Sequence, residues 1–319
     1  MAIDFETTEP LEARIKVIGV GSGGISSINK MIQSQLVGVE FIVVDTDPQS
    51  LAHSLAHTKI KVGVESIPEI DVNSKLDIGN MFSEHSREQI REILQGADMV
   101  FLISGMGSGF GTFSVPIFAN IAKEMDILTV AVVTKPFYSE GKRRMCIANA
   151  GLLALHSHTD AIITIPNQKL LSVSENKIAQ VNAFCSANDI IYKTVRGITD
   201  LICIPGLIRV DFADVRTILD EAGSARVGIA ESAGDTRAIY GAKKALSCPL
   251  MDEISIQNAS GVLINITGGY NLELQEVDEA VTIIRDMLND EANIVFGAIL
   301  DESMDKNIRV TVITTGIGE

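Results

Sequence analysis

Apolar and polar residues alternate in blocks along the first half of the chain, and this pattern predicts strands separated by helices. Short runs rich in β-branched residues have the length of buried strands. They occupy 15–20, 40–45, 98–104, 127–133 and 160–165. Amphipathic stretches with helical spacing lie between them, at 24–36, 83–95, 113–125 and 142–157. Continuous apolar strands joined by helices indicate a parallel sheet covered on both faces.

A longer helical pattern follows the last of these strands. Apolar residues recur at helical intervals from Val173 to Ile202, and Pro205-Gly206 ends the pattern. The rest of the chain predicts helix 212–222, strand 224–231, helix 235–247, strand 260–267, helix 273–289 and strands 293–300 and 307–314. This order is typical of a smaller α+β domain with a mixed sheet. We expect a flexible arm at 1–12, a parallel-sheet, Rossmann-like α/β domain at 13–172, a central helix at 173–203 and a C-terminal domain at 204–319.

Composition narrows the choice of partners. A net charge of −15 argues against non-specific binding to nucleic acid or to an anionic membrane surface. No apolar run reaches the length of a membrane span, so we expect no direct membrane insertion. The cysteines lack the spacing of a zinc or dithiol site, which is typical of reduced thiols in a cytoplasmic protein. They are Cys146, Cys185, Cys203 and Cys248. We predict no metal site built from the chain itself.

Two glycine-rich turns carry the candidate chemistry. The first, Gly19–Gly24, follows the first predicted strand, and the second, Gly105–Thr112, follows the third. Glycine permits positive φ and close backbone approach, so successive N–H groups can converge on an anion. A helix that begins directly afterwards adds its positive N-terminal end. Two such turns at one edge of a sheet predict a phosphate group held from two sides.

The first turn alone leaves another interpretation open. Gly19-x-Gly21-x-x-Gly24, with Asp45 at the end of the next strand, fits the fingerprint of an NAD-binding oxidoreductase. No His, Tyr-x-x-x-Lys or Cys constellation supplies hydride-transfer chemistry, however. The glycines of each turn could also serve only as tight strand-to-helix connections. No GxxxxGK[ST] sequence is present, which excludes an ordinary P-loop NTPase.

The surroundings of the second turn resemble a known family. Gly105-Met-Gly-Ser-Gly-Phe-Gly-Thr112 is similar to the glycine-rich signature of the tubulin/FtsZ family. Similar motifs follow in the same order along the chain. They are Lys123–Phe137, Glu140–Arg144, Ile165–Asn167, Ala187–Asp189, Pro205–Val215 and Gly261–Thr267. The resemblance extends from about Ile15 to Gly318, and the long helix matches the one that joins the family's two domains.

The resemblance implies a guanine-nucleotide site with GTP or GDP as ligand and Mg²⁺ as its companion cation. The phosphate-binding residues would be Gly21, Ser22, Gly23, Gly24, Ile25 and Ser26 in the first turn, and Gly107, Ser108, Gly109, Phe110, Gly111 and Thr112 in the second. Glu140 and Arg144 match residues that contact the ribose and its surroundings. Asn167, Asn188 and Asp189 match residues around the guanine, where a carboxylate accepts from N1–H and N2–H, a pattern that adenine does not offer.

The segment Arg209–Asp214 resembles the loop that enters the neighbouring subunit's nucleotide site. There Asp211 and Asp214 would be catalytic, polarising the attacking water and helping to bind the cation. Hydrolysis would then need head-to-tail contact between copies of the chain, which builds a filament. The same two aspartates also suit a helix N-cap, and both roles can hold together.

Several positions differ from the family pattern, and they cluster at the nucleotide. Phe110 and Phe113 stand where the family has threonine and glycine, and Ile25-Ser26 replaces a glycine-asparagine pair. A ring at 110 would fill part of the phosphate volume, and Ile25 would resist positive φ. The loop expected at the γ-phosphate aligns with Asp71–Asp77. Arg209 replaces an asparagine, where it would act as an arginine finger or form an interface salt bridge.

We therefore expect a cytoplasmic, FtsZ-like GTPase of weak activity that polymerises head to tail, by itself or with a conventional family member or other division proteins. The alternative is a structural filament protein whose degenerate nucleotide site no longer uses GTP hydrolysis for assembly. A dehydrogenase remains the third interpretation.

Overall fold

The computed structural model describes residues 13–63, 82–173, 180–251 and 256–317. The predicted arm at 1–12 and the segment Asp71–Asp77 lie outside the described residues. The strands are β1 (Ile15–Val20), β2 (Val39–Asp45), β3 (Thr58–Lys61), β4 (Met99–Gly105), β5 (Leu128–Lys135), β6 (Ala161–Pro166), β7 (Gly223–Ala233), β8 (Gly261–Gly268), β9 (Asn293–Leu300) and β10 (Asn307–Thr315).

The helices lie mainly where the apolar spacing predicts them. They are α1 (Gly21–Gln33), α2 (Pro48–Ala52), α3 (Glu84–Leu94), α4 (Gly109–Glu124), α5 (Lys142–His156), α6 (Asn167–Val173), α7 (Gln180–Cys203), α8 (Phe212–Leu219), α9 (Arg237–Leu246) and α11 (Leu274–Arg285), with short 3-10 turns at Tyr138–Glu140 and Glu302–Met304. None of the described helices is long and apolar enough to cross a lipid bilayer.

The strands form one sheet in the order β3-β2-β1-β4-β5-β6-β7-β10-β8-β9. All pairings from β3 to β7 are parallel, whereas β10 is antiparallel to both β7 and β8. The predicted parallel α/β fold and the smaller mixed-sheet unit are confirmed. The two parts meet where β6 pairs with the beginning of β7, from Ala161↔Gly223 to Ile163↔Ala225.

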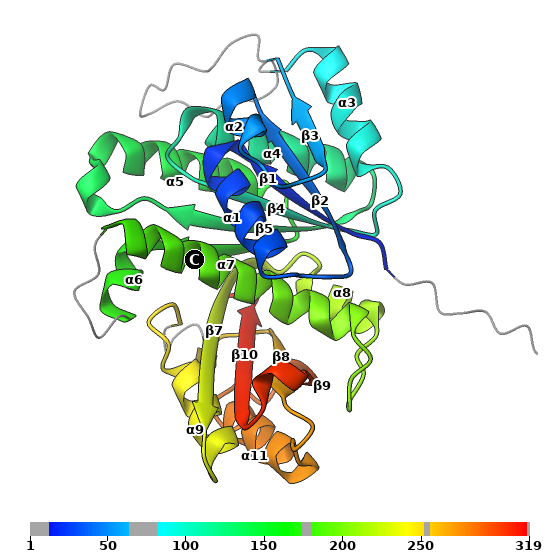
Figure 1. Cartoon of the computed structure of the whole chain (residues 1–319), viewed down its shortest axis with the longest axis vertical. Helices are drawn as coiled ribbons and strands as arrows, with labels where there is room; N and C mark the ends of the chain where they lie inside the picture. Colours follow the sequence, from blue (N-terminus) through cyan, green and yellow to red (C-terminus); the bar gives the residue numbers. More distant parts are fainter. Residues whose placement is uncertain (1–12, 64–81, 174–179, 252–255, 318–319) are drawn as a thin grey trace, which may run out of the picture.

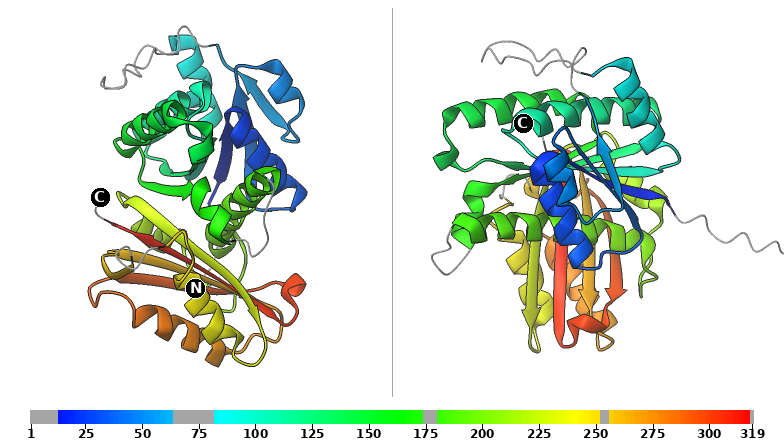
Figure 2. Two further views of the ribbon diagram at one scale, coloured as in Figure 1. Left: turned by 90° about the vertical axis from the view of Figure 1, so that its left-hand side faces the viewer. Right: turned by 45° about the horizontal axis from the view of Figure 1, so that its top comes forward.

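Each face of the sheet has its own apolar cluster. On one face of the first part, α1 and α7 pack through Ile28, Met31 and Val195 onto alternate strand residues. On the opposite face, α3, α4 and α5 pack on the residues between them. In the second part, α9 and α11 cover the outer face of β7–β10. The helix α7 lies between the two parts of the molecule (Figures 1 and 2).

The structure contains three short elements that the sequence pattern does not predict, namely α2, β3 and α6. Asp47 caps α2 by accepting from Gln49 N and Ser50 N, and Pro48 occupies its first turn. The four residues of β3 are a short edge strand with alternating burial. Residues 174–179 lie outside the described part of the chain, so the expected start of the long helix at 173 stays a prediction.

Candidate functional site

The two glycine turns lie side by side because the strands before them are neighbours. β1 and β4 pair in parallel with Val20 opposite Ser104, so both turns leave the same edge of the sheet. The hydroxyl of Ser104 donates to the carbonyl oxygen of Val20 at 3.0 Å and joins the two strand ends. The position at the carboxyl ends of parallel strands is where α/β sheets commonly bind ligands.

The glycines allow the two turns to pack backbone against backbone. A Cβ at Gly24 would collide with the carbonyl oxygen of Ile103, and one at Gly111 would lie 2.5 Å from the Ser104 hydroxyl. Gly21 and Gly107 have φ of +72° and +99°, which side chains rarely adopt. These positions therefore require glycine for the shape of the site.

Two helix N-termini open into the space beside the turns. α1 begins at Gly21 and α4 at Gly109, and neither has an acidic residue in its first turn or a side-chain cap. Their first N–H groups have no partner within the helix and carry the positive end of its dipole. The arrangement suits an anion such as a chain of phosphates.

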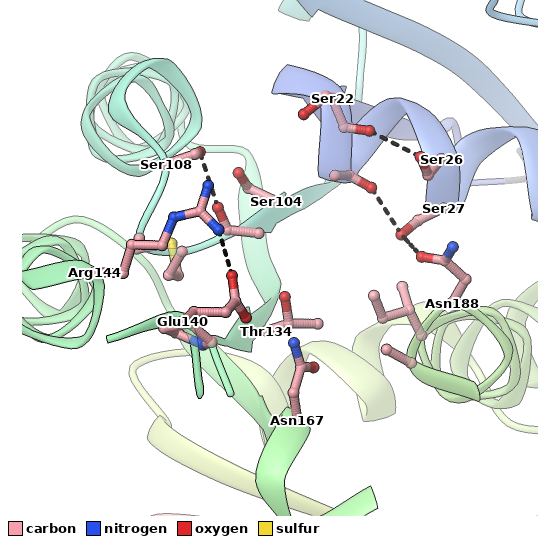
Figure 3. Close-up of a pocket in the computed structure, with 17 residues that line it drawn as sticks. Ser22, Ser26, Ser27, Ser104, Ser108, Thr134, Glu140, Arg144, Asn167 and Asn188 are labelled. Carbon is pink, nitrogen blue, oxygen red and sulfur yellow. Dashed lines mark hydrogen bonds and ion pairs between the residues drawn. The ribbon is translucent and has the colours of Figure 1, made fainter. Parts of the chain in front are cut away.

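A polar pocket extends from these turns toward α7. Its described lining is Ser22, Gly23, Ser26, Ser27, Ser104, Gly105, Met106, Gly107, Ser108, Thr134, Pro136, Glu140, Arg144, Asn167, Ala187, Asn188 and Ile191. Figure 3 shows the serines at one side of this space and Glu140, Arg144, Asn167 and Asn188 around the rest of it. The structure thus brings together nine of the seventeen predicted nucleotide-binding residues in the lining of a single pocket.

Glu140 and Arg144 form a linked pair at the pocket wall. Arg144 Nη1 donates to Glu140 Oε2, and Glu140 Oε1 accepts from the backbone N–H of Phe137 at 2.8 Å. Both carboxylate oxygens are therefore engaged. Among the described residues that line the pocket, Glu140 is the single carboxylate.

Two asparagines on different elements complete the far end of the pocket. Asn188 on α7 accepts a hydrogen bond at Oδ1 from the hydroxyl of Ser27 on α1, at 2.8 Å, which leaves its amide N–H₂ as a donor. Asn167, where α6 begins, is 3% exposed, and its Oδ1 has no partner among the described residues. A buried polar atom without a partner is costly unless a ligand or water satisfies it.

Other predicted residues face away from the pocket. The carboxylate of Asp189 lies 3.6 Å from Lys30 Nζ and 3.4 Å from Lys193 Nζ, in a separate depression between α1 and α7. Thr112 is buried and accepts from Gly107 N–H at 2.8 Å, which holds the second turn in shape. Gly21, Gly24, Gly109 and Gly111 contribute backbone geometry and are not part of the described lining.

Two residues that were expected to disturb the site, Ile25 and Phe110, pack against other parts of the chain. Ile25 lies inside α1, is 4% exposed and packs into the core, while Gly21 adopts the positive φ. The ring of Phe110 packs edge-on against Phe82, with centroids 6.3 Å apart. It is not among the residues that line the described pocket. The backbone conflict expected at Ile25 is therefore not found, while obstruction of a phosphate by the Phe110 ring stays a prediction.

The predicted catalytic aspartates are not part of the described lining of this pocket. Asp211 precedes α8 and Asp214 lies in its first turn, both exposed, with Asp214 Oδ2 accepting from Asp211 N–H at 3.2 Å. Arg209 in the same segment is also exposed. The helix-cap role of the pair is thus present within one chain, and the carboxylates remain accessible to a second molecule.

Sequence reasoning missed several lining residues. Ser27, Ser104 and Thr134 supply hydroxyl groups, and Met106, Pro136, Ala187 and Ile191 supply the remaining wall. Ser104 and Thr134 lie at the carboxyl ends of β4 and β5, a position that signals the ligand edge of a parallel sheet. Asp45, the residue that suggested a dinucleotide, accepts from Thr46 N–H and Asp47 N–H in its own turn instead.

Comparisons with known proteins agree with this geometry. The model for the tubulin/FtsZ family GTPase domain matches residues 14–175, and that for the FtsZ family C-terminal domain matches residues 223–318. The cell division protein FtsZ of Coxiella burnetii is 45% identical over 311 residues, which are 98% of this chain and 81% of that protein. FtsZ of Caulobacter vibrioides is also 45% identical, over 99% of this chain and 63% of its own length.

Solved structures of FtsZ and of a related protein have the same fold as this chain. An FtsZ dimer from M. jannaschii superposes with a TM-score of 0.85 at 35% identity, covering 97% of this chain and 90% of that one. CetZ2 from Haloferax volcanii, solved as a GTPgS-bound protofilament, has a TM-score of 0.78 at 18% identity over 96% and 94% of the two chains, a likeness of fold alone. From the matched domains and the near-complete coverage at 45% identity, the chain belongs to the tubulin/FtsZ family, as a member of the FtsZ type.

Proposed function

We propose that this chain binds GTP in the pocket beside the two glycine turns, hydrolyses it to GDP and phosphate, and polymerises head to tail into cytoskeletal filaments of cell division. The chain spans less than two thirds of some curated relatives, such as that of Caulobacter vibrioides, so the proposal concerns the part of the protein described here. It rests on the pocket's chemistry together with family membership.

The observation that carries the proposal is the unpartnered Oδ1 of buried Asn167 in the pocket wall. With the Asn167 amide turned so that its oxygen faces the cavity, an acceptor there would suit the N1–H and N2–H donors of guanine, and the amide N–H₂ of Asn188 would suit its O6 acceptor. Adenine presents a donor where guanine has O6 and an acceptor where guanine has N1–H. These two asparagines would therefore favour a guanine nucleotide.

The phosphates would lie on the backbone N–H groups of Gly21–Ser26 and Gly107–Thr112, where the dipoles of α1 and α4 add attraction. Glu140 and Arg144 would contact the ribose and its surroundings. Asp189 would reach the base only after its carboxylate leaves Lys30 and Lys193. Mg²⁺ would be held mainly by the phosphates, because no cluster of three or more His, Cys, Asp or Glu side chains placed to hold a metal ion occurs among the described residues.

Hydrolysis would need a second subunit. The single carboxylate of the described lining, Glu140, is already engaged at both oxygens, so it is poorly suited to activate water. The exposed Asp211 and Asp214 of a neighbour would supply that function in trans. A contact between the pocket of one subunit and the α8 end of the next is heterologous and propagates into a filament.

Four measurements on the purified chain test this proposal. Denaturation should release guanine nucleotide, GTP should bind more tightly than ATP, and phosphate release per subunit should rise with protein concentration as neighbours complete the site. Sedimentation with GTP should show polymer. Monomers under all conditions, with a phosphate-release rate per subunit independent of concentration, would contradict the proposal.

The alternative, a filament protein that has lost the use of GTP, is not favoured. Four departures from the family pattern motivate it, at Ile25, Asp71, Phe110 and Arg209. Ile25 packs in the core without positive φ, and Phe110 packs on Phe82 outside the described lining, while Asp71 lies outside the described residues. The dehydrogenase interpretation fails because the chain belongs to the tubulin/FtsZ family and Asp45 is engaged in its own turn.

A further inference from the structure

The segment before α8 carries a positive charge beside the two candidate catalytic aspartates. This charge is the guanidinium of Arg209, which is exposed. It forms no ion pair with Asp211 or Asp214, and its side chain has no partner among the described residues. An arginine without a partner on the surface of one subunit is available to a second molecule.

The backbone around Arg209 is fixed on strand β9. Ile208 N–H donates to the carbonyl oxygen of Ala298, and Ala298 N–H donates to that of Ile208, each at 3.2 Å. Val210 is 8% exposed and packs into the core. Burial thus alternates along the segment, and alternate residues of an extended segment share a face. Arg209 and Asp211 therefore project together from the exposed side of a well-anchored segment.

The candidate nucleotide pocket lacks a free positive side chain of its own. Its described lining includes two charged residues, Glu140 and Arg144, and these form an ion pair with each other. Phosphoryl transfer moves negative charge among the phosphate oxygens, and a positioned cation stabilises that charge in the transition state. Among the described lining residues no unpaired cation is in place for this task, so a neighbouring subunit is the natural source of one.

We propose that Arg209 is a third catalytic residue, which acts on the nucleotide of the neighbouring subunit by donating N–H groups to the oxygens of its γ-phosphate. The inference rests on the proposed function, because it requires Asp211 and Asp214 to reach the same pocket in trans. The water oxygen forms a bond to the γ-phosphorus and gives a proton to a carboxylate of this pair. The bond from that phosphorus to the β–γ bridging oxygen breaks, and its electron pair leaves with GDP.

The structure favours this role over an interface salt bridge, the other role that the sequence leaves open for Arg209. Glu140 is the single carboxylate of the described pocket lining, and both of its oxygens are already engaged. It is therefore a poor partner for an incoming guanidinium. Phosphate oxygens are a good one, because the planar guanidinium places two N–H groups in parallel on two oxygens.

Arg209→Gln tests the proposal through two separate measurements. Phosphate release per polymerised subunit should fall by about a hundredfold or more, because the transition-state charge loses its cation. The critical concentration for assembly with a non-hydrolysable GTP analogue should stay within about twofold of the parent, because the residue acts on the transition state. Arg209→Lys, which keeps the charge and loses the fork, should fall between the two. Lys244→Gln, at an exposed position of α9, is the control for net charge and should behave like the parent.

An equal mixture of Arg209→Gln and Asp214→Asn subunits shows which subunit supplies the arginine. When both groups come from the same neighbour, no interface in the mixed polymer is complete, and the rate should stay at the average of the two variants. Recovery of a substantial share of the parental rate would mean that Arg209 serves its own pocket, which would overturn the proposal.

Unchanged turnover per polymerised subunit in Arg209→Gln would also overturn the proposal, and so would a raised critical concentration, which is the result that an interface salt bridge predicts. Binding of labelled GDP, measured on every variant, reports folding independently. If Asp214→Asn loses hydrolysis and Arg209→Gln keeps it, the proposed function stands and this inference fails. A parent chain that neither polymerises nor hydrolyses GTP would overturn both.

Discussion

The hydroxyl of Ser27 on α1 donates to Oδ1 of Asn188 on α7 at 2.8 Å and thereby connects the helix of the first glycine turn to the long central helix. Ser27 is 1% exposed, and the bond is partly buried at the wall of the polar pocket. It also fixes which end of the Asn188 amide faces the pocket. The position of one side chain in the candidate site is thus set by another 161 residues away in the chain.

Ser27→Ala should weaken GDP binding by about fivefold, close to 1 kcal/mol, because Asn188 loses the partner that orients its amide. Fluorescence titration with a labelled GDP measures the change. Ser247→Ala, at an exposed serine after α9, is the control and should bind like the parent. Equal affinity in both variants would show that this hydrogen bond does not shape the site.

Gly24→Ala should destabilise the protein by about 2 kcal/mol and weaken GDP binding, because its Cβ would collide with the carbonyl oxygen of Ile103 and force α1 away from β4. Urea unfolding gives the stability change. Gly63→Ala is the matched control, since a Cβ there meets no atom of the described residues within 4 Å, and it should stay within about 0.5 kcal/mol of the parent. A stable Gly24→Ala variant would mean that the close packing of the two turns is dispensable.

Asp214→Asn should reduce GTP hydrolysis by about tenfold or more while GDP affinity and unfolding free energy stay near those of the parent. The amide keeps an oxygen that can accept from Asp211 N–H, so the start of α8 is preserved and only the charge is lost. Phosphate release and labelled-GDP binding separate these effects. Asp278→Asn, at an exposed position of α11, controls for net charge. Full activity in Asp214→Asn would remove this carboxylate from the mechanism.

Phe110→Thr should leave GTP affinity within about twofold of the parent and lower stability by about 1 kcal/mol, the worth of a well-placed aromatic pair. The ring packs on Phe82 and not into the described pocket. A double-mutant cycle with Phe82→Leu isolates the pair energy, with labelled-nucleotide binding measured in parallel. A marked gain in GTP affinity would show that the ring obstructs the phosphates.

The pair of Arg237 and Glu276 predicts a pH-dependent contribution to stability. Glu276 accepts from Arg237 Nε at 2.7 Å, and this hydrogen bond lowers the pKa of Glu276 below its ordinary value. The stabilisation is therefore present at neutral pH and is lost as the pH falls through the lowered folded-state pKa. Glu276→Gln should cost about 2 kcal/mol at pH 7 and progressively less in acid. Urea unfolding across pH checks this, with exposed Glu291→Gln as control; a pH-independent difference would contradict it.

The sequence predicts the strands and helices well because burial on both faces leaves long apolar runs and clear helical spacing. The glycine turns were equally visible, since their chemistry is local. The orientation of the Asp189 side chain could not be predicted from the sequence, because it depends on Lys30 from another helix. Likewise Phe110 is directed by Phe82, and Ser104 enters the site through the pairing of β1 with β4. These are consequences of three-dimensional neighbours, which spacing along the chain does not reveal.

The short ladder between β6 and β7 has a mechanical consequence. It contains three residue pairs, fewer than any other strand boundary in the described sheet. When bending or tension is transmitted through a subunit, the boundary with the fewest interstrand bonds yields first, so compliance concentrates there. The stiffness of a polymer of this chain would then be governed by a patch of backbone within each subunit as well as by the contacts between subunits.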